Sequence, residues 1–135
     1  MIQKIKSAVQ IAAIFCAIWG VGLPHAHAIQ ITTNPADSSV VDTLNKRAFT
    51  NRLKNSKLSL VGAEQALALA KQLHYTKGEA EAYRMMGLAT YYLFETEKSI
   101  SYYLKSLQLF VATKNKAGQA KVLNNIGGLY SQTDY

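Results

Sequence analysis

Cysteine, proline and histidine are scarce in this 135-residue chain, and they are unevenly distributed. The single cysteine, Cys16, lies in the segment that ends at Ala28, as do two of the three histidines. Both prolines, Pro24 and Pro35, lie near the N-terminus, so the rest of the chain is free of the residue that most strongly breaks a helix. A hydrophobic fraction of 49% is enough for a packed core. The composition therefore favours one domain built entirely of helices.

The shortage of ligating and nucleophilic side chains excludes several kinds of chemistry. After Ala28 the chain has no cysteine and one histidine, His74, which cannot form a metal site without neighbouring ligands. The sequence has neither a Ser/His/Asp arrangement nor a glycine loop that could hold phosphate. The nearest carboxylate pair, Glu79 and Glu81, is two residues apart and so falls on different faces of a helix. We expect a protein that is not an enzyme and holds no metal or cofactor.

The N-terminal segment, from Met1 to Ala28, has the pattern of a secretory signal. Two lysines precede an apolar run that ends in Ala26-His27-Ala28, and small residues at these places favour cleavage after Ala28. An uncleaved anchor is the weaker alternative, because the run is interrupted and a membrane-spanning helix needs roughly 20 apolar residues. The membrane is a partner only in that case. We predict a signal peptide over 1–28, a linker over 29–37 and a domain over 38–135, secreted into the periplasm or another extracytoplasmic space.

The positive charge does not indicate a nucleic-acid site. The formal charge of +7 falls by two, to +5, when Lys4 and Lys6 leave with the signal. The remaining lysines are scattered and often lie beside Glu or Gln, without a dense basic run. This distribution is typical of a solvated helical surface, and export also argues against nucleic acid as a partner.

A 40-residue repeat organises the chain after the linker. Shifting the sequence by one period places Gly87 over Gly127 and Ser59 over Ser99. Apolar residues recur at three- and four-residue spacing within each half of the period, which predicts helices packed on one side. The connecting segments are short, so neighbouring helices should be antiparallel. We predict helices over 38–54, 57–74, 79–93, 97–113 and 119–133.

The glycines inside these helices indicate close packing. Glycine costs roughly 1 kcal/mol relative to alanine within a helix, so its presence needs a reason. Gly87 and Gly127 are expected where two helices approach closely, and Ala48 has the same place in the first unit. The same periodicity predicts that Tyr103 and Tyr130 belong to the core.

These residues resemble the tetratricopeptide repeats. The second unit has Tyr83 and Gly87 in its first helix, then Ser99 and Ser106 in its second, and the third carries Leu-Asn-Asn-Ile-Gly-Gly-Leu-Tyr over 123–130. Helix pairs of that family combine large and small residues in this way. The period here exceeds the family's roughly 34 residues, and the proline that usually closes the second helix is absent. The spacing resembles the long-repeat subclass found in kinesin light chains and in sensor-associated regions of bacterial signalling proteins.

The resemblance, which covers residues 38–135, implies an all-α fold. Antiparallel helix-turn-helix repeats would stack as a right-handed α-solenoid of about two and a half repeats. The structural repeat positions would be Ala48, Gly87, Ser99, Ser106 and Gly127. The first helices of successive repeats would line a concave groove for a peptide. The residues of that groove would be Arg84, Leu88, Tyr91, Tyr92, Asn124, Asn125 and Gln132.

Those residue types suit an extended peptide. Asparagine offers both a donor and an acceptor to backbone, arginine grips a carboxylate through two hydrogen bonds, and tyrosine buries area at low entropy cost. An alternative of equal weight is that Asn124 and Asn125 only face solvent and bind no ligand.

We therefore expect an exported, non-catalytic repeat module that binds a protein or peptide. The alternative is the N-terminal sensory region of a longer bacterial signalling protein, such as a histidine kinase, cyclase or regulator. A stripe of Leu123, Ile126 and Tyr130 in the last repeat would need a second helix to cover it, so we also expect self-association through this open C-terminal repeat.

Overall fold

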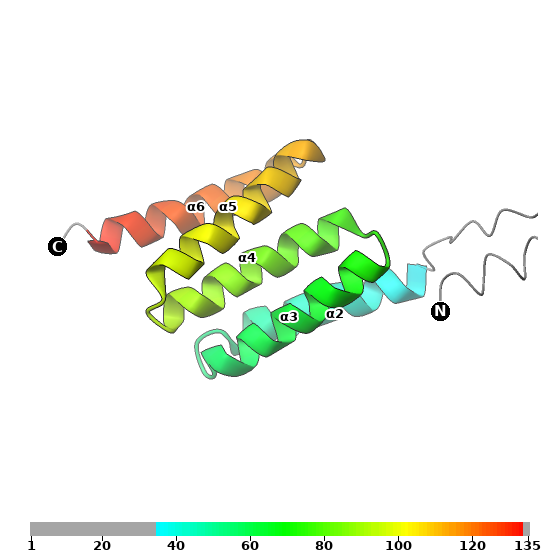
Figure 1. Ribbon diagram of the computed structural model, residues 1–135, viewed down its shortest axis with the longest axis horizontal. Helices are drawn as coiled ribbons and strands as arrows, with labels where there is room; N and C mark the ends of the chain where they lie inside the picture. Colours follow the sequence, from blue (N-terminus) through cyan, green and yellow to red (C-terminus); the bar gives the residue numbers. More distant parts are fainter. Residues whose placement is uncertain (1–34, 134–135) are drawn as a thin grey trace, which may run out of the picture. The chain divides into compact units, whose positions relative to one another are not determined.

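A computed structural model describes residues 35–133 of the protein, with side chains from Ser38 to Ser131. These residues form five α-helices and no strand (Figure 1), so the prediction of an all-α fold is confirmed. The helices are α2 (Pro35–Asn51), α3 (Ser56–Gln72), α4 (Thr76–Tyr92), α5 (Thr96–Ala112) and α6 (Lys116–Thr133). The predicted signal peptide lies outside the described residues. None of the described helices is long and apolar enough to cross a membrane.

The helices pack mainly on their neighbours in sequence. Each contacts the next one along the chain, and α4 additionally contacts α2 and α6. Figure 1 shows α4 in the middle, with α2 and α3 on one side of it and α5 and α6 on the other. Among the described helices α3 and α5 do not contact each other. The first helices α2, α4 and α6 therefore form a continuous row, which α3 and α5 cover at separate places.

Some helix ends differ from those that the sequence predicts. Helix α2 ends three residues early, and α4 and α6 begin three residues early, so that they take Gly78 and Gly118 into their first turns. Tertiary packing explains these glycines. A Cβ at Gly78 would meet the ring of Tyr75 and come within 2.7 Å of Val41, and one at Gly118 would meet the ring of Phe110. Only glycine leaves room for these side chains.

Three successive helices end in the same way. His74, Phe94 and Lys114 each follow the C-cap residue of a helix, and they have φ values of 53°, 62° and 54°. In each case the next residue donates its backbone N–H to the carbonyl five residues before it, at 2.8–2.9 Å. This is a Schellman motif, whose left-handed residue is usually glycine because a side chain is unfavourable there. The motif turns the chain back within a few residues, so the helices that it joins are antiparallel.

Helix α4 and its neighbours share the main core. The largest fully buried side chains there are Tyr103, Phe110 and Met85. The core position predicted for Tyr103 is confirmed, since 1% of the residue is exposed. Burial raises the pKa of its phenol to about 12, so it stays neutral. The core position predicted for Tyr130 is wrong, because that residue is 54% exposed on a face of α6 that no described helix covers.

Buried serines tie the second helices to the first. Each hydroxyl donates to a backbone carbonyl across the helix pair: Ser59 to Ala48 at 2.7 Å, Ser99 to Gly87 at 2.8 Å and Ser106 to Ala80 at 2.7 Å. All six of these residues are buried. Since a hydroxyl can reach a carbonyl of a neighbouring helix only when the two helices lie close, the small residues at these places follow from the contact. Gly127, by contrast, is exposed.

Candidate functional site

Three adjoining hollows run along the row of first helices. The first, of about 330 Å³, lies between α2, α4 and α6. The second, of about 400 Å³, shares Phe49, Arg84 and Lys121 with it. The third, of about 160 Å³, shares Asn124 and Asn125 with the second. We call this continuous furrow the groove. Its lining consists of Asp42, Asn45, Lys46, Phe49, Lys77, Glu81, Arg84, Met85, Leu88, Tyr91, Tyr92, Tyr103, Lys121, Asn124, Asn125 and Gly128.

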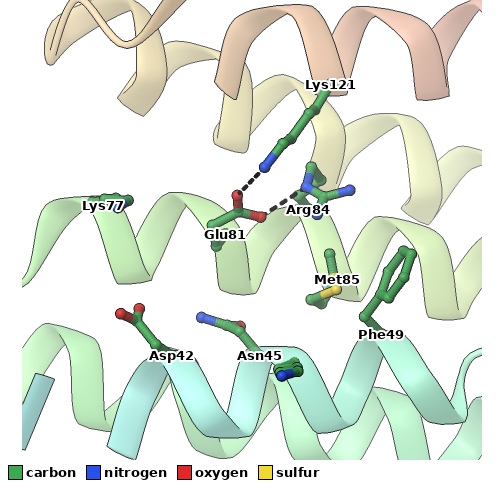
Figure 2. Close-up of a pocket in the computed structure, with 9 residues that line it drawn as sticks. Asp42, Asn45, Phe49, Lys77, Glu81, Arg84, Met85 and Lys121 are labelled. Atoms are coloured by element: carbon green, nitrogen blue, oxygen red, sulfur yellow. Dashed lines mark hydrogen bonds and ion pairs between the residues drawn. The ribbon is translucent and has the colours of Figure 1, made fainter. Parts of the chain in front are cut away.

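Glu81 lies at the centre of the charged half of the groove. Its Oε2 accepts a hydrogen bond from Nε of Arg84 at 2.8 Å, and Lys121 Nζ lies 3.5 Å from its Oε1 (Figure 2). The side chains of Arg84 and Glu81 are only 12% and 20% exposed. Solvent therefore screens this pair less than an ordinary surface ion pair. Two cations neutralise a single carboxylate here, and the ion pair orients the guanidinium through Nε alone.

The rest of the charged half carries an excess of positive charge. Lys46 and Lys77 line the first hollow, and neither has a carboxylate within 4 Å among the described residues. Asp42 is the other carboxylate, and it accepts a hydrogen bond from the hydroxyl of Tyr75 at 3.1 Å. Four cationic side chains thus line the hollow together with two carboxylates. Its net charge favours an anionic ligand.

Two asparagines offer buried hydrogen-bonding atoms that lack a partner. Asn45 is 7% exposed, and its Nδ2 donates to the carbonyl of Gly78 at 3.1 Å. Its Oδ1 is buried and has no hydrogen-bond partner among the described residues, and the same holds for Nδ2 of Asn125. Leaving such an atom unsatisfied costs about 1–3 kcal/mol. Asn45 and Asn125, which line the groove, thus each hold one buried amide atom whose hydrogen-bonding capacity is unused among the described residues.

The other half of the groove is aromatic and uncharged. The rings of Tyr91 and Tyr92 lie 5.0 Å apart at an interplanar angle of 74°, an edge-to-face arrangement. They line the third hollow with Leu88, Tyr103 and Gly128. No ionisable acid or base other than tyrosine contributes to this hollow. It suits an apolar or aromatic side chain of a ligand.

Most residues that the sequence singles out as groove residues come together in this furrow. Arg84 lies in its charged half, and Leu88, Tyr91 and Tyr92 lie in its aromatic half. Asn124 and Asn125 line the place where the second and third hollows join. The side chain of Gln132 lies outside those described.

Sequence reasoning overlooked the contribution of α2 and the charged residues around Glu81. The missed residues are Asp42, Asn45, Lys46, Phe49, Lys77, Glu81, Met85, Tyr103, Lys121 and Gly128. A signal for α2 was available in the repeat. The offset that aligns Ala48 with Gly87 also aligns Asn45 with Arg84, and the 40-residue period aligns Arg84 with Asn124. The three residues therefore occupy equivalent positions on the successive first helices α2, α4 and α6.

The described part of the chain contains no group of three His, Cys, Asp or Glu side chains that could hold a metal ion. No protein-family model matches the chain, and no curated protein matches it either. Its function must therefore be inferred from the chemistry of the groove.

Proposed function

We propose that this protein is an exported, non-catalytic module that binds an extended segment of another protein in the groove. The observation that carries the proposal is the continuous furrow along α2, α4 and α6, with cations in excess at one end and tyrosines at the other. Unsatisfied amide atoms lie between the helices that line it. Such a surface recognises backbone and side chains without needing a reactive group.

The architecture that we propose for the module is a right-handed α-solenoid of tetratricopeptide type. Two observations support it. One period of the repeat carries the bounds of α3 onto those of α5, and the first residue of α4 onto that of α6. The serine-to-carbonyl bonds of Ser59 and Ser99 also recur from one unit to the next. A repeated contact of this kind gives each unit a similar relation to the one before it, which is how a solenoid is built.

The groove also defines the character of its ligand. The cations around Glu81 favour acidic side chains at one end of the bound segment. The tyrosine hollow favours an apolar or aromatic side chain at the other end. Because Arg84 uses only Nε toward Glu81, its terminal amino groups remain to grip a carboxylate of the ligand. We therefore propose a segment with acidic residues followed or preceded by an aromatic one.

Fluorescence anisotropy with defined peptides tests this function. One labelled 12-residue probe has glutamates at one end and tyrosine and leucine at the other, and a second has lysines in place of the glutamates. The acidic probe should bind more tightly, and raising the salt concentration should weaken it, because part of the attraction is between exposed charges. Equal binding of both probes, or no binding of either, would contradict the proposal.

Two lysines at equivalent places provide a matched charge-reversal test. Lys77 and Lys57 are each the second residue of a helix, and both are exposed, but only Lys77 lines the groove. Lys77→Glu should weaken the acidic probe about fivefold or more, which corresponds to roughly 1 kcal/mol. Lys57→Glu changes the net charge equally and should leave the affinity within about twofold. Equal losses would mean that only net charge matters.

The uncharged contacts need a variant of their own. Replacing Arg84, Tyr91, Asn124 and Asn125 together by alanine should remove binding, since each lost buried contact costs on the order of 1–3 kcal/mol. Circular dichroism of the variant provides the control for folding. A folded variant with unchanged affinity would show that the ligand binds elsewhere.

A further inference from the structure

The groove follows the length of two parallel helices. Along α4, the first hollow takes residues within 77–85 and the third takes residues within 88–92. Helix α6 supplies its residues in the same order, from Lys121 in the first hollow to Gly128 in the third. Tight turns join both helices to α5, so both are antiparallel to α5 and parallel to each other. The charged half of the groove therefore lies toward the first residues of α4 and the aromatic half toward its last.

Helix α2 reaches only part of the groove. It lines the first hollow and, through Phe49, the second, but none of its described residues lines the third. A segment laid across the three helices would meet them at one level and would touch one half of the groove only. A segment must lie along α4 to contact the cations and the tyrosine hollow together.

Arg84 is the fixed point for a carboxylate of the ligand. Its side chain is 12% exposed, and Glu81 accepts a hydrogen bond from its Nε at 2.8 Å (Figure 2). The guanidinium is thus already ordered before a ligand binds, which lowers the entropy cost of binding. Lys77, by contrast, is exposed and has no carboxylate within 4 Å among the described residues. It attracts acidic residues further out without fixing their place.

The tyrosine hollow is the fixed point for an apolar or aromatic side chain. Tyr91 is half-buried there and packs edge-to-face on Tyr92. The hollow measures about 160 Å³ and is the smallest of the three. Pockets for whole small molecules begin at about 300 Å³, so this one is suited to a single side chain.

The distance between the two fixed points follows from the helix geometry. Arg84 and Tyr91 are seven residues apart on α4, which is about 10 Å at a rise of about 1.5 Å per residue. Lys121 and Gly128 give the same separation on α6. An extended chain advances about 3.3 Å per residue, so about three residues cover this distance.

We propose that the ligand lies along α4 and carries its acidic residue and its aromatic or apolar residue three or four positions apart. This inference rests on the proposed function and adds the register of the bound segment. Three positions match the distance from Arg84 to the tyrosine hollow, and the length of the ligand's side chains accommodates a fourth. The spacing is the same for either direction of the bound chain, because it depends on that distance alone.

Displacement of the labelled acidic probe from the complete chain by unlabelled peptides tests the spacing. Each peptide carries one glutamate and one tyrosine in a proline-rich background, which keeps the peptide extended. The two residues are one, three or seven positions apart, and each peptide is made in both orders. In the better order, a spacing of three should displace the probe at a concentration about fivefold or more below that needed at one or seven, because only three lets both anchors bind at once.

Two tyrosines provide a matched pair of variants. Tyr91 and Tyr102 are both half-buried and each packs against another ring, but only Tyr91 lines the groove. Tyr91→Ala should remove the preference for a spacing of three and bring the peptides within about twofold of one another. Tyr102→Ala should retain the preference. Circular dichroism checks that both variants fold, and the peptide series on the native protein decides the question if Tyr91→Ala does not.

The outcomes separate this inference from the proposed function. If the labelled probe binds but displacement does not depend on spacing, or is best at one or seven positions, the inference is overturned and the proposed function stands. A preference for three that survives in folded Tyr91→Ala also overturns it, since the aromatic anchor would then lie elsewhere. If the labelled probe itself does not bind, the proposed function fails and the inference fails with it.

Discussion

Three glycines within helices offer a sharp test of the packing described above, because alanine should have opposite effects at them. Alanine is better than glycine by roughly 1 kcal/mol in a helix. At Gly62 a Cβ would lie 3.8 Å from that of Ala48, which is an ordinary contact, and at Gly127 it would meet nothing described. Both substitutions should therefore stabilise the fold by up to about 1 kcal/mol.

Gly87→Ala should do the reverse. Its Cβ would lie 2.5 Å from two ring carbons of Tyr103, a side chain that is buried and cannot simply swing away. Overpacking of this kind costs typically about 1–3 kcal/mol, and the short distance indicates the upper part of that range. After the gain in helix propensity, a net loss of about 1–2 kcal/mol remains.

Thermal unfolding followed by far-ultraviolet circular dichroism measures the difference. For a domain of this size a change of about 1 kcal/mol corresponds to roughly 4–8 °C. Gly62→Ala and Gly127→Ala should thus melt a few degrees above the native protein and Gly87→Ala clearly below it. The comparison is made in dilute solution, so that association does not contribute. If Gly87→Ala melts as high as Gly62→Ala, the ring of Tyr103 does not hold the close contact on which this reasoning depends.

Other consequences concern single side chains. Ser106→Ala removes the hydrogen bond to the carbonyl of Ala80 and should destabilise the fold by about 1 kcal/mol in urea denaturation, and an unchanged midpoint would show that the bond contributes nothing. Phe94 is 93% exposed with φ 62°, so Phe94→Gly should raise the free energy of unfolding by about 0.5–1 kcal/mol, whereas a lower stability would contradict the assigned turn. Because burial raises the pKa of Tyr103 from 10 to about 12, the unfolded chain releases this proton first, and stability should fall by up to about 2–3 kcal/mol between pH 10 and 12. Tyr103→Phe should flatten that part of the pH profile, and a profile identical to that of the native protein would count against the assignment.

Much of the groove can be read from the repeat, but its charged centre cannot. The 40-residue period places Arg84 and Asn124 at equivalent points on first helices, so their presence on one surface follows from the pattern. The role of Glu81 does not follow from the repeat pattern. The pattern places it in the first turn of a helix, where a carboxylate is favourable for local reasons. Its partner Arg84 lies three residues further along the same helix, a spacing at which side chains meet, but Lys121 belongs to α6, and only tertiary packing brings it to Glu81.

The sequence by itself determined the helical class, the period and the stripe of residues that each helix turns toward its neighbours, because these depend on local spacing along the chain. It could not decide which stripes are covered. Gly87 and Gly127 occupy the same place in the repeat, yet one is buried under Tyr103 and the other is open, and Tyr103 and Tyr130 differ in burial in the same way. Gly78 and Gly118, in the first turns of α4 and α6, likewise leave room for Val41 and Phe110, which belong to other helices. A residue is buried when another helix packs over it. The local sequence pattern does not contain the position of that other helix.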